Sequence, residues 1–290
     1  MKIRFVINPI SGTGKQKGIE DYISRYIRNY EIYYTKCKGD AKKIAAEAVR
    51  KKFDIVIAVG GDGTVNECVS SLINTSTALA VIPCGSGNGF ANHIGMKKNT
   101  KEAIRQLNNT EIDSIDYCTI NKYPFVNVSG IGFDAHIAEI FGRSKKRGLI
   151  NYIKIILKEL NYKSQKYNIK YNGIEREINA FLISFANASQ YGNNIKISPM
   201  SDISDGEFEV VIVKQFPKWK IPIFIFQIIT EKIHLSKYVE IISCKKIQII
   251  SNKALIHLDG EPKFTSTPIN VNLFKKSLKI LIPKTNKNEK

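Results

Sequence analysis

Three glycine-rich loops each follow directly after an apolar run that is typical of a buried strand. The runs are 3–7, 54–59 and 79–83, and the loops are 8–15, 60–64 and 83–91. Between them, apolar residues recur at helical spacing in 19–30 and 65–72, and an alanine-rich segment at 40–51 is also typical of a helix. Repeated strand, loop and helix favour a parallel sheet with helices on both faces.

The carboxyl ends of parallel strands lie at one edge of a sheet, where ligands commonly bind. The segment 60–64, Gly-Gly-Asp-Gly-Thr, is the most informative loop. Glycines let a phosphate approach the backbone N–H groups closely, and the following helix N-terminus attracts anions. A single turn of this kind could equally be a tight connection capped by Asp62. Because all three loops share this composition, we predict a nucleotide site instead.

After residue 120 the pattern changes to short β-rich runs separated by turns. The expected strands are 123–129, 167–171, 178–186, 208–213, 246–250, 254–258, 269–273 and 278–282, and the expected helices are 149–160 and 218–232. This pattern predicts an antiparallel sandwich or barrel. We therefore expect an α/β domain at 1–120, a β-rich domain at 121–284 and a polar tail at 285–290.

Charge is the unusual feature of the composition. The chain has 44 Lys and Arg against 26 Asp and Glu, a formal net charge of +18, with the larger excess after residue 120. Apolar residues make up 43% and charged residues 24%, which excludes collagen-like and wholly disordered chains. The charge favours anionic partners: phosphates, nucleic acid or acidic lipid headgroups.

No secretory signal is evident, and no apolar run reaches the length of about 18 residues that a membrane span needs. The five cysteines are widely separated, which is typical of reduced thiols. We expect a cytoplasmic protein.

The motifs together resemble a known family. They are Asn-Pro-x-Ser-Gly-x-Gly-Lys at 8–15, Gly-Gly-Asp-Gly-Thr-x-Asn-Glu at 60–67, Gly-Ser-Gly-Asn-Gly-Phe-Ala at 85–91 and Leu-Asp-Gly-Glu-Pro at 258–262, with Asn187, Tyr191-Gly192, Pro199 and Asp205-Gly206 between them. This combination resembles the diacylglycerol kinase catalytic-domain family, which includes soluble bacterial lipid kinases and sphingosine kinases. The resemblance covers about residues 3 to 282. Gly-Gly-Asp-Gly-Thr by itself also resembles NAD kinases and phosphofructokinases.

The resemblance implies a Rossmann-like parallel sheet of the NAD kinase and diacylglycerol kinase type, followed by a mainly antiparallel β-sandwich. It implies ATP- and Mg²⁺-dependent transfer of the γ-phosphate to a lipid hydroxyl, with 121–284 as the lipid-substrate domain. The nucleotide-binding residues would be Asn8, Ser11, Gly12, Gly14, Lys15, Thr35, Gly60, Gly61, Asp62, Gly63, Thr64, Val65, Asn66, Glu67, Gly85, Ser86, Gly87 and Asn88.

The resemblance also implies that Asp259 is the general base that accepts the hydroxyl proton. The metal-holding residues would be Asp202, Asp205, Glu207 and Glu261, with several ligands being backbone carbonyls and Glu261 acting through water. Hard oxygen ligands such as these suit Mg²⁺. From the residues alone, however, Asp259-Gly260 is also typical of a hairpin turn between two strands.

The acceptor is left open. Gly89 stands where many diacylglycerol kinases have an aspartate, and this version of the loop is closer to the sphingosine kinase pattern. Diacylglycerol, a sphingoid base, a monoacylglycerol and phosphatidylglycerol all offer a hydroxyl on an apolar body. Alternatives are a kinase for a soluble acceptor such as NAD, and a non-enzymatic protein that binds anionic membrane or nucleic acid.

As partners we expect a lipid alcohol and, peripherally, the inner face of an anionic bilayer, with a homodimer left open and no nucleic acid. The run 218–229 fits an interfacial helix, although such runs more often belong to the core. The basic segment 143–147 is typical of a solvated face. We interpret His93, His136, His234 and His257 as isolated structural or surface residues.

Overall fold

The computed structural model describes residues 1–12, 16, 18–144, 148–251 and 255–284. The chain forms two compact units, one made of Met1–Ile115 with the chain from Lys276 onward, the other of Asp116–Lys275. Two strands, β5 (Thr110–Ile120) and β18 (Ile269–Pro283), contribute residues to both units. The sequence places 276–283 in the second domain, whereas here they join the first unit because Ile280 of β18 pairs with Leu79.

The first unit is built on a parallel sheet. Its strands run in the order β2-β1-β3-β4-β18 and are β1 (Ile3–Ile7), β2 (Tyr30–Tyr34), β3 (Ile55–Gly60), β4 (Ala78–Pro83) and the last part of β18. Strands β1, β3 and β4 are buried along their whole length. This is the burial that continuous apolar runs predict for a sheet covered on both faces.

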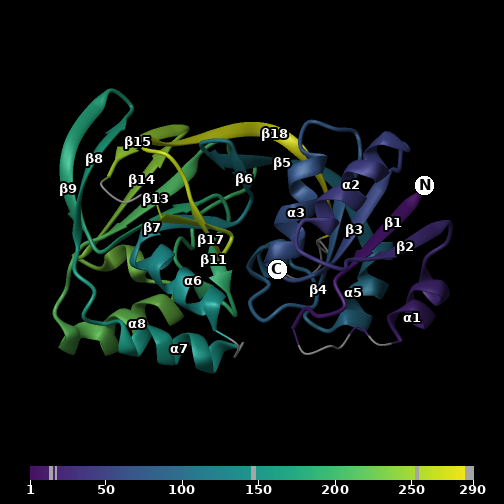
Figure 1. Ribbon diagram of the computed structural model, residues 1–290, viewed down its shortest axis with the longest axis horizontal. Helices are drawn as coiled ribbons and strands as arrows, with labels where there is room; N and C mark the ends of the chain where they lie inside the picture. The colour runs from purple at the N-terminus through teal and green to yellow at the C-terminus, as the bar shows by residue number, and fades with distance from the viewer. Residues whose placement is uncertain (13–15, 17, 145–147, 252–254, 285–290) are drawn as a thin grey trace. The chain divides into compact units, whose positions relative to one another are not determined.

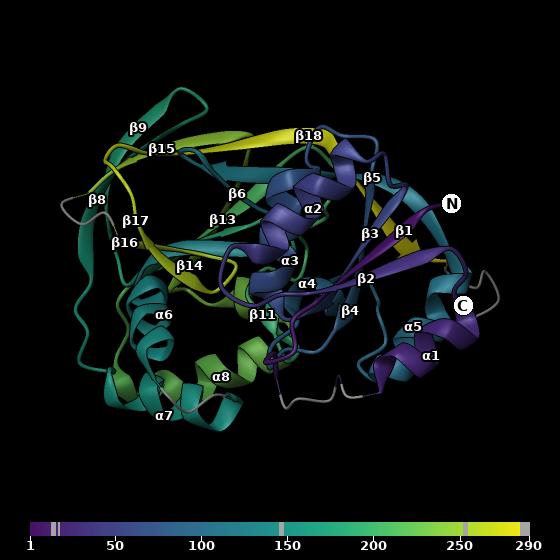
Figure 2. The same cartoon turned by 45° about the vertical axis from the view of Figure 1, so that its right-hand side comes forward.

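Helices cover both faces of that sheet. They are α1 (Ile19–Tyr26), α2 (Asp40–Arg50), α3 (Asp62–Leu72), α4 (Gly89–His93) and α5 (Thr100–Gln106), with a short 3₁₀ helix at Leu107–Asn109. Helices α2 and α3 pack together on one face, and α1 and α5 pack together on the other (Figures 1 and 2). The buried residues Val65, Val69 and Leu72 form the inner stripe of α3, as their spacing predicts.

The second unit is a sandwich of antiparallel sheets. One sheet runs β14-β13-β10-β7-β16-β17, and the other pairs β9, β8, β15 and the first part of β18. The strands are β7 (Val128–Gly132), β8 (Gln165–Tyr171), β9 (Ile174–Ala180), β10 (Leu182–Ala186), β13 (Phe208–Val213), β14 (Val239–Cys244), β15 (Lys246–Ile250), β16 (Leu255–Leu258) and β17 (Glu261–Phe264). Short strands β6 (Tyr123–Phe125), β11 (Gln190–Gly192) and β12 (Ile195–Lys196) flank them.

Two apolar clusters stabilise this unit. One lies between the sheets and contains residues such as Phe125, Phe185 and Phe208. The other lies between the β7–β10–β13 part of its sheet and three helices, α6 (Phe133–Arg143), α7 (Leu149–Lys158) and α8 (Ile221–Ile229), drawn together in Figure 1. Short 3₁₀ helices at Lys218–Lys220 and Ile233–Leu235 flank α8. The predicted fold class is therefore confirmed.

Several boundaries differ from the expectation. The run 178–186 is two strands, β9 and β10, because the chain turns sharply at Phe181. The two strands expected at 269–273 and 278–282 are the single long strand β18. No element was expected from the sequence where α6 lies. Within the described residues, no helix is both long and apolar enough to cross a bilayer.

Candidate active site

The structure brings the three glycine-rich loops of the first unit into direct contact. A Cβ placed on Gly12 would lie 2.0 Å from the carbonyl oxygen of Cys84, and one on Gly85 would lie 2.5 Å from the Cα of Gly61. Such distances are shorter than any real side chain tolerates, so only glycine fits at these contacts. The three loops form one continuous backbone surface at the carboxyl edge of the sheet.

The loop after β1 is fixed by its own polar side chains. The Nδ2 of Asn8 donates to the Oγ1 of Thr64 at 3.2 Å, and the Oδ1 of Asn8 accepts from the N–H of Ile10. Buried Gln16 donates to the carbonyls of Asn8 and Ser11 at 3.2 and 2.8 Å. Gln16 is a loop-holding residue that the sequence did not indicate, because its partners are backbone atoms.

Gly14 and Lys15, both predicted nucleotide ligands, lie outside the described residues. Thr35 follows β2, and its N–H donates to the carbonyl of Ile7, which places it beside the start of the 8–12 loop.

The Gly60–Thr64 segment forms the connection between β3 and α3. Gly61 is the N-cap residue of α3 and provides no capping side chain, and its carbonyl accepts from the N–H groups of Thr64 and Val65 at 3.0 and 3.2 Å. The Oδ1 of Asp62 accepts from the N–H of Phe90 at 3.4 Å, so this carboxylate links α3 to the start of α4. Thr64 and Val65 are buried, and Gly63 and Asn66 are half-buried in the first turn.

Glu67 has a clear structural partner. Its two carboxylate oxygens accept from the N–H groups of Gly39 and Ala41 at 2.8 and 3.2 Å. Glu67 therefore caps α2 from the neighbouring helix. Gly39 is the N-cap residue of α2, and the neighbouring Asp40 accepts from the N–H groups of Lys36 and Cys37.

The loop after β4 closes on itself through Asn88. Its side chain accepts from the N–H of Gly85 and donates to the carbonyl of Gly85, both at 2.8 Å. The carbonyl of Gly87 accepts from the Nδ2 of Asn92. Ser86 is exposed at the tip, so its hydroxyl is open to a ligand.

In the second unit, Asp259 and Gly260 form the two-residue turn between β16 and β17. Their φ angles are +47° and +87°, and Leu258 pairs with Glu261 across the turn. Two positive φ angles define a type I′ hairpin turn, for which Asp-Gly is a preferred sequence. The hairpin expected from the residues alone is therefore present.

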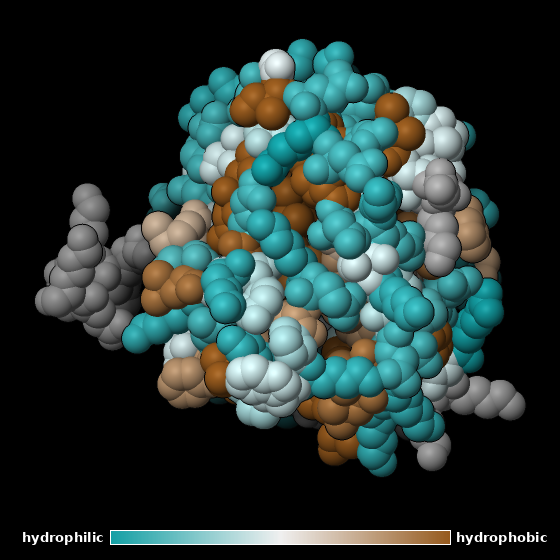
Figure 3. Space-filling model, turned by 90° about the vertical axis from the view of Figure 1, so that its left-hand side faces the viewer, coloured by the Kyte–Doolittle hydropathy of each residue, from teal (hydrophilic) through white to brown (hydrophobic). Residues whose placement is uncertain are grey.

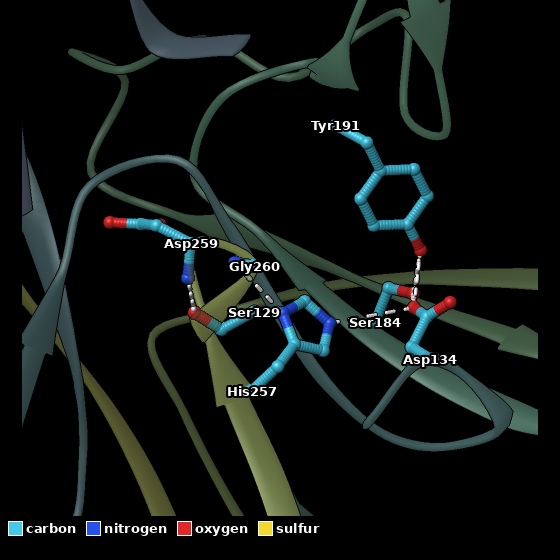
Figure 4. Close-up of polar contacts among 7 residues, drawn as sticks. All are labelled: Ser129, Asp134, Ser184, Tyr191, His257, Asp259 and Gly260. Atoms are coloured by element: carbon cyan, nitrogen blue, oxygen red, sulfur yellow. Dashed lines mark hydrogen bonds and ion pairs between the residues drawn. The ribbon is translucent and has the colours of Figure 1, made fainter. Parts of the chain in front are cut away.

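The turn also fixes the Asp259 carboxylate. Its Oδ1 accepts from the N–H of Asn127 at 3.0 Å and its Oδ2 from the N–H of Val126 at 3.3 Å, while its own N–H donates to the Oγ of Ser129 (Figure 4). Asp259 is only 8% exposed. A buried carboxylate held by two backbone donors has one defined orientation, which suits a group that must meet a substrate atom.

The acidic loop 202–207 is held by local turns. Asp202 accepts from the N–H and the hydroxyl of Ser204, and Asp205 accepts from the N–H of Glu207. Buried Asp116 accepts from the N–H of Gly206 at 2.7 Å, and its own N–H donates to the carbonyl of Ile203. Asp116 anchors this loop, although no motif in the sequence marked it.

The carboxylates do not form a metal site by themselves. Across residues 1–284, apart from the gaps given above, no three His, Cys, Asp or Glu side chains converge as cation ligands. Asp202, Asp205 and Glu261 are exposed, and Glu207 is half-buried. The proposed role of these four residues as Mg²⁺ ligands, with carbonyls and water, stays a prediction.

The interpretation of His257 as an isolated residue is wrong. His257 is 3% exposed, lies beside the Asp259-Gly260 turn and faces Asp134 of α6. Ser184 and Tyr191 bind the same carboxylate. These residues are distant in the sequence, so no local pattern joins them.

Comparison with known proteins identifies the two units. Residues 2–120 match the family described as the diacylglycerol kinase catalytic domain, and residues 127–282 match the YegS C-terminal NAD kinase beta sandwich-like domain. The chain belongs to the diacylglycerol kinase family. The predicted family and the prediction of an enzyme, a phosphotransferase of the lipid kinase type with an alcohol acceptor, are confirmed.

Individual relatives agree with this membership. A Chromohalobacter salexigens protein named "Probable lipid kinase YegS-like" is 32% identical over 78% of this chain and 75% of its own length. The diacylglycerol kinase of Bacillus subtilis is 29% identical over 74% of each. The crystal structure of a diacylglycerol kinase from Bacillus anthracis has a TM-score of 0.73 over 97% of this chain and 96% of its own, with 22% identity, and so shares the fold.

Proposed function

We propose that this diacylglycerol kinase family member transfers the γ-phosphate of ATP to the hydroxyl of a lipid, with diacylglycerol or a similar lipid alcohol as the acceptor. The observation that carries the proposal is the Asp259 carboxylate, held by two backbone N–H groups at a rigid turn in the family's Asp-Gly-Glu segment. The names of the curated relatives support a lipid acceptor.

The joined loops of the first unit are the proposed nucleotide site. The uncapped start of α3, the exposed hydroxyl of Ser86 and the glycine backbone at 60–63 offer N–H and O–H donors to phosphate oxygens. Asn8, Asp62 and Asn88 hold these loops in place through the hydrogen bonds described above. These donors fit a polyphosphate, because enzymes that transfer a phosphoryl group act mainly by positioning it and neutralising its charge.

In the proposed step, the Asp259 carboxylate accepts the proton of the acceptor hydroxyl as its oxygen attacks the γ-phosphorus. A new phosphorus–oxygen bond forms, and the bond between the γ-phosphorus and the bridging oxygen breaks with its electron pair leaving on ADP. A positioned base of this kind contributes on the order of 10²–10⁴-fold to the rate. Mg²⁺ bound with the nucleotide would neutralise phosphate charge, and usually keeps several waters of its own.

We also propose that the second unit meets an anionic bilayer, where a lipid alcohol resides. Helix α8 contains no buried residue, and its exposed apolar side chains include Phe226 at 63% and Ile229 at 67%. Trp219 is 71% exposed and carries the ammonium group of Lys220 over its ring. Of the two alternatives for this run, burial in the core does not hold, because only Phe224 and Ile228 of α8 pack on the apolar cluster beneath it.

Helix α7 adds a parallel stripe. Ile150, Ile153 and Leu157 are exposed, and Lys154 and Lys158 lie on the same helix. Figure 3 shows apolar residues at the lower edge of this face, where Figure 1 draws α7 and α8, and others nearer its middle. Exposed apolar residues with lysines beside them suit a bilayer of anionic lipid. Each basic residue near the surface of such a bilayer contributes on the order of 1 kcal/mol to the binding free energy. A cytoplasmic, peripheral location and a homodimer stay predictions.

The test is an acceptor panel. Purified protein with γ-labelled ATP and Mg²⁺ is offered diacylglycerol, monoacylglycerol, a sphingoid base, phosphatidylglycerol and, without lipid, NAD. The proposal expects label in at least one lipid and none in NAD. Label in NAD alone, or in no acceptor, would contradict it.

A further inference from the structure

Three neighbouring strands of the second unit place Ser184, Gly130 and His257 in one row. Gly130 of β7 pairs with Ser184 of β10 on one side and with His257 of β16 on the other. A Cβ on Gly130 would lie 3.1 Å from the Nε2 of His257 and 3.3 Å from the Oδ2 of Asp134. The missing side chain therefore leaves the space in which the imidazole and the Asp134 carboxylate face each other.

Several groups converge on the Oδ2 of Asp134. Ser184 donates its hydroxyl at 2.6 Å, Tyr191 donates its phenol, and the Nε2 of His257 lies 3.7 Å away (Figure 4). Burial, followed by the Asp134 carboxylate, raises the pKa of Tyr191 well above its usual value, so the phenol stays a donor. Asp134 is thus a buried carboxylate that is held beside the imidazole.

The other face of the imidazole supports the turn. The N–H of Gly260 donates to the Nδ1 of His257 at 3.3 Å. A ring nitrogen that accepts a hydrogen bond carries no proton, so the proton of the neutral ring is assigned to Nε2. The Nε2 is buried without a hydrogen-bond partner among the described residues, and Asp134 is the carboxylate that it faces.

We propose that His257 is a positioning residue for Asp259, and that Asp134 keeps the imidazole of His257 in the tautomer whose Nδ1 carries no proton. Resting on the proposed function, this inference adds a residue that acts through the turn rather than on the substrate. The Nδ1 of His257 holds the N–H of Gly260, and the Oγ of Ser129 holds the N–H of Asp259. Together they fix the two peptide planes on either side of the Asp259 Cα, and so the direction of its carboxylate.

Two variants separate the two ring nitrogens. In His257→Asn the side-chain amide oxygen lies near the place of Nδ1 and can accept from the N–H of Gly260. In His257→Gln the side-chain amide nitrogen lies near the place of Nε2 and can donate to Asp134, but the N–H of Gly260 loses its acceptor. We expect His257→Gln to lower kcat by about tenfold or more with the KM for ATP nearly unchanged, because a misaimed base slows only the chemical step. We expect His257→Asn to recover kcat to within about threefold of the wild type.

A matched control is His136→Gln, since the Nε2 of His136 contacts Glu159 at 2.8 Å on the helices of the same unit. It should leave kcat unchanged. If His257→Gln and His257→Asn lose kcat equally, and the loss in each matches its fall in melting temperature, the role of His257 is purely structural. That result would overturn the proposal.

A second measurement needs no activity. In ¹⁵N NMR, His257 should be the Nε2-protonated tautomer, and Asp134→Asn should shift it toward the other tautomer. The amide of Gly260 should exchange slowly in the wild type and in His257→Asn, and rapidly in His257→Gln. If no lipid is phosphorylated but this pattern holds, the proposed function fails while the support of the turn stands; an Nδ1-protonated wild type, or equal exchange in both variants, overturns the inference.

Discussion

Gly61 and Gly85 meet backbone to backbone, so that a Cβ on Gly85 would fall 2.5 Å from the Cα of Gly61. The first residue follows β3 and the second follows β4, and both loops belong to the proposed nucleotide site. Their glycines are required by this contact as well as by any approach of phosphate. A side chain here must separate the two loops.

Gly85→Ala tests that contact. Overpacking typically costs about 1–3 kcal/mol, and the separated loops should lower nucleotide affinity by about tenfold or more. Titration calorimetry with ATP and a thermal melt measure both effects. Gly95→Asn is the control, because Gly95 has open space around it and asparagine tolerates its positive φ. Unchanged affinity in Gly85→Ala would argue against a nucleotide on these loops.

A variant of Glu67 separates its role in capping α2 from its predicted role in binding the nucleotide. Since its carboxylate caps the start of α2, Glu67→Ala should lower the stability of the protein by about 1 kcal/mol, the usual cost of a lost cap. We expect ATP affinity to change little, measured on folded protein. A large loss of affinity without a loss of stability would support the predicted role of Glu67 as a nucleotide ligand.

Glu209 predicts a pH effect on stability. Its side chain is buried on β13, and burial raises the pKa of its carboxyl above the usual value, with Asp205 and Glu207 adding to the increase. A raised folded-state pKa means that the neutral form is favoured in the native protein, so its contribution to stability is present at low pH and is lost as pH rises through the folded pKa.

Glu209→Gln keeps the neutral form at every pH and an acceptor for the hydroxyl of Ser201. We expect it to raise the melting temperature at pH 7, with the difference shrinking as pH falls toward 4. Melting curves between these pH values measure it. A variant that is less stable at pH 7 would contradict the sign.

The surface of α8 is tested with vesicles. Phe226→Ser combined with Ile229→Ser removes two largely exposed apolar side chains, and should reduce sedimentation with anionic vesicles by about fivefold or more. Ile112→Ser, at another exposed apolar position, is the control. Equal binding by the double variant and the wild type would remove α8 from the membrane-facing surface.

The elements of the first unit were largely predictable from the sequence. Buried parallel strands such as β3 and β4 are continuous apolar runs, and glycines follow them at once. The three loops could be assigned to one sheet edge because parallel topology leaves little choice. What the sequence could not show is that Glu67 caps α2, because that pairing is set by the packing of α3 against α2.

In the second unit, α6 was missed although Phe133, Ile137 and Phe141 recur every fourth residue. The helix begins directly at the end of β7, after Gly132, without a polar capping residue to signal it. With α6 missing, Asp134 had no assigned place. His257 consequently had no visible partner, since the pairing of β7 with β16 and the start of α6 at the end of β7 bring the two together.

The exposure of α8 was also beyond the sequence. Its composition fits a core helix, but only Phe224 and Ile228 pack on the apolar cluster beneath it. Hydrophobicity alone does not show which face of a short helix packs against the rest of the protein. A stripe left uncovered is informative only once the fold is known.

The most direct test of the central claim is the rate of lipid phosphorylation by Asp259→Asn, measured with γ-labelled ATP and the best acceptor of the panel. The variant keeps the size of the side chain and removes its capacity to accept a proton. We predict a fall in kcat of about 10²-fold or more, with ATP affinity and melting temperature close to the wild type. Turnover within a few fold of the wild type would show that another group takes the proton, and would contradict the account.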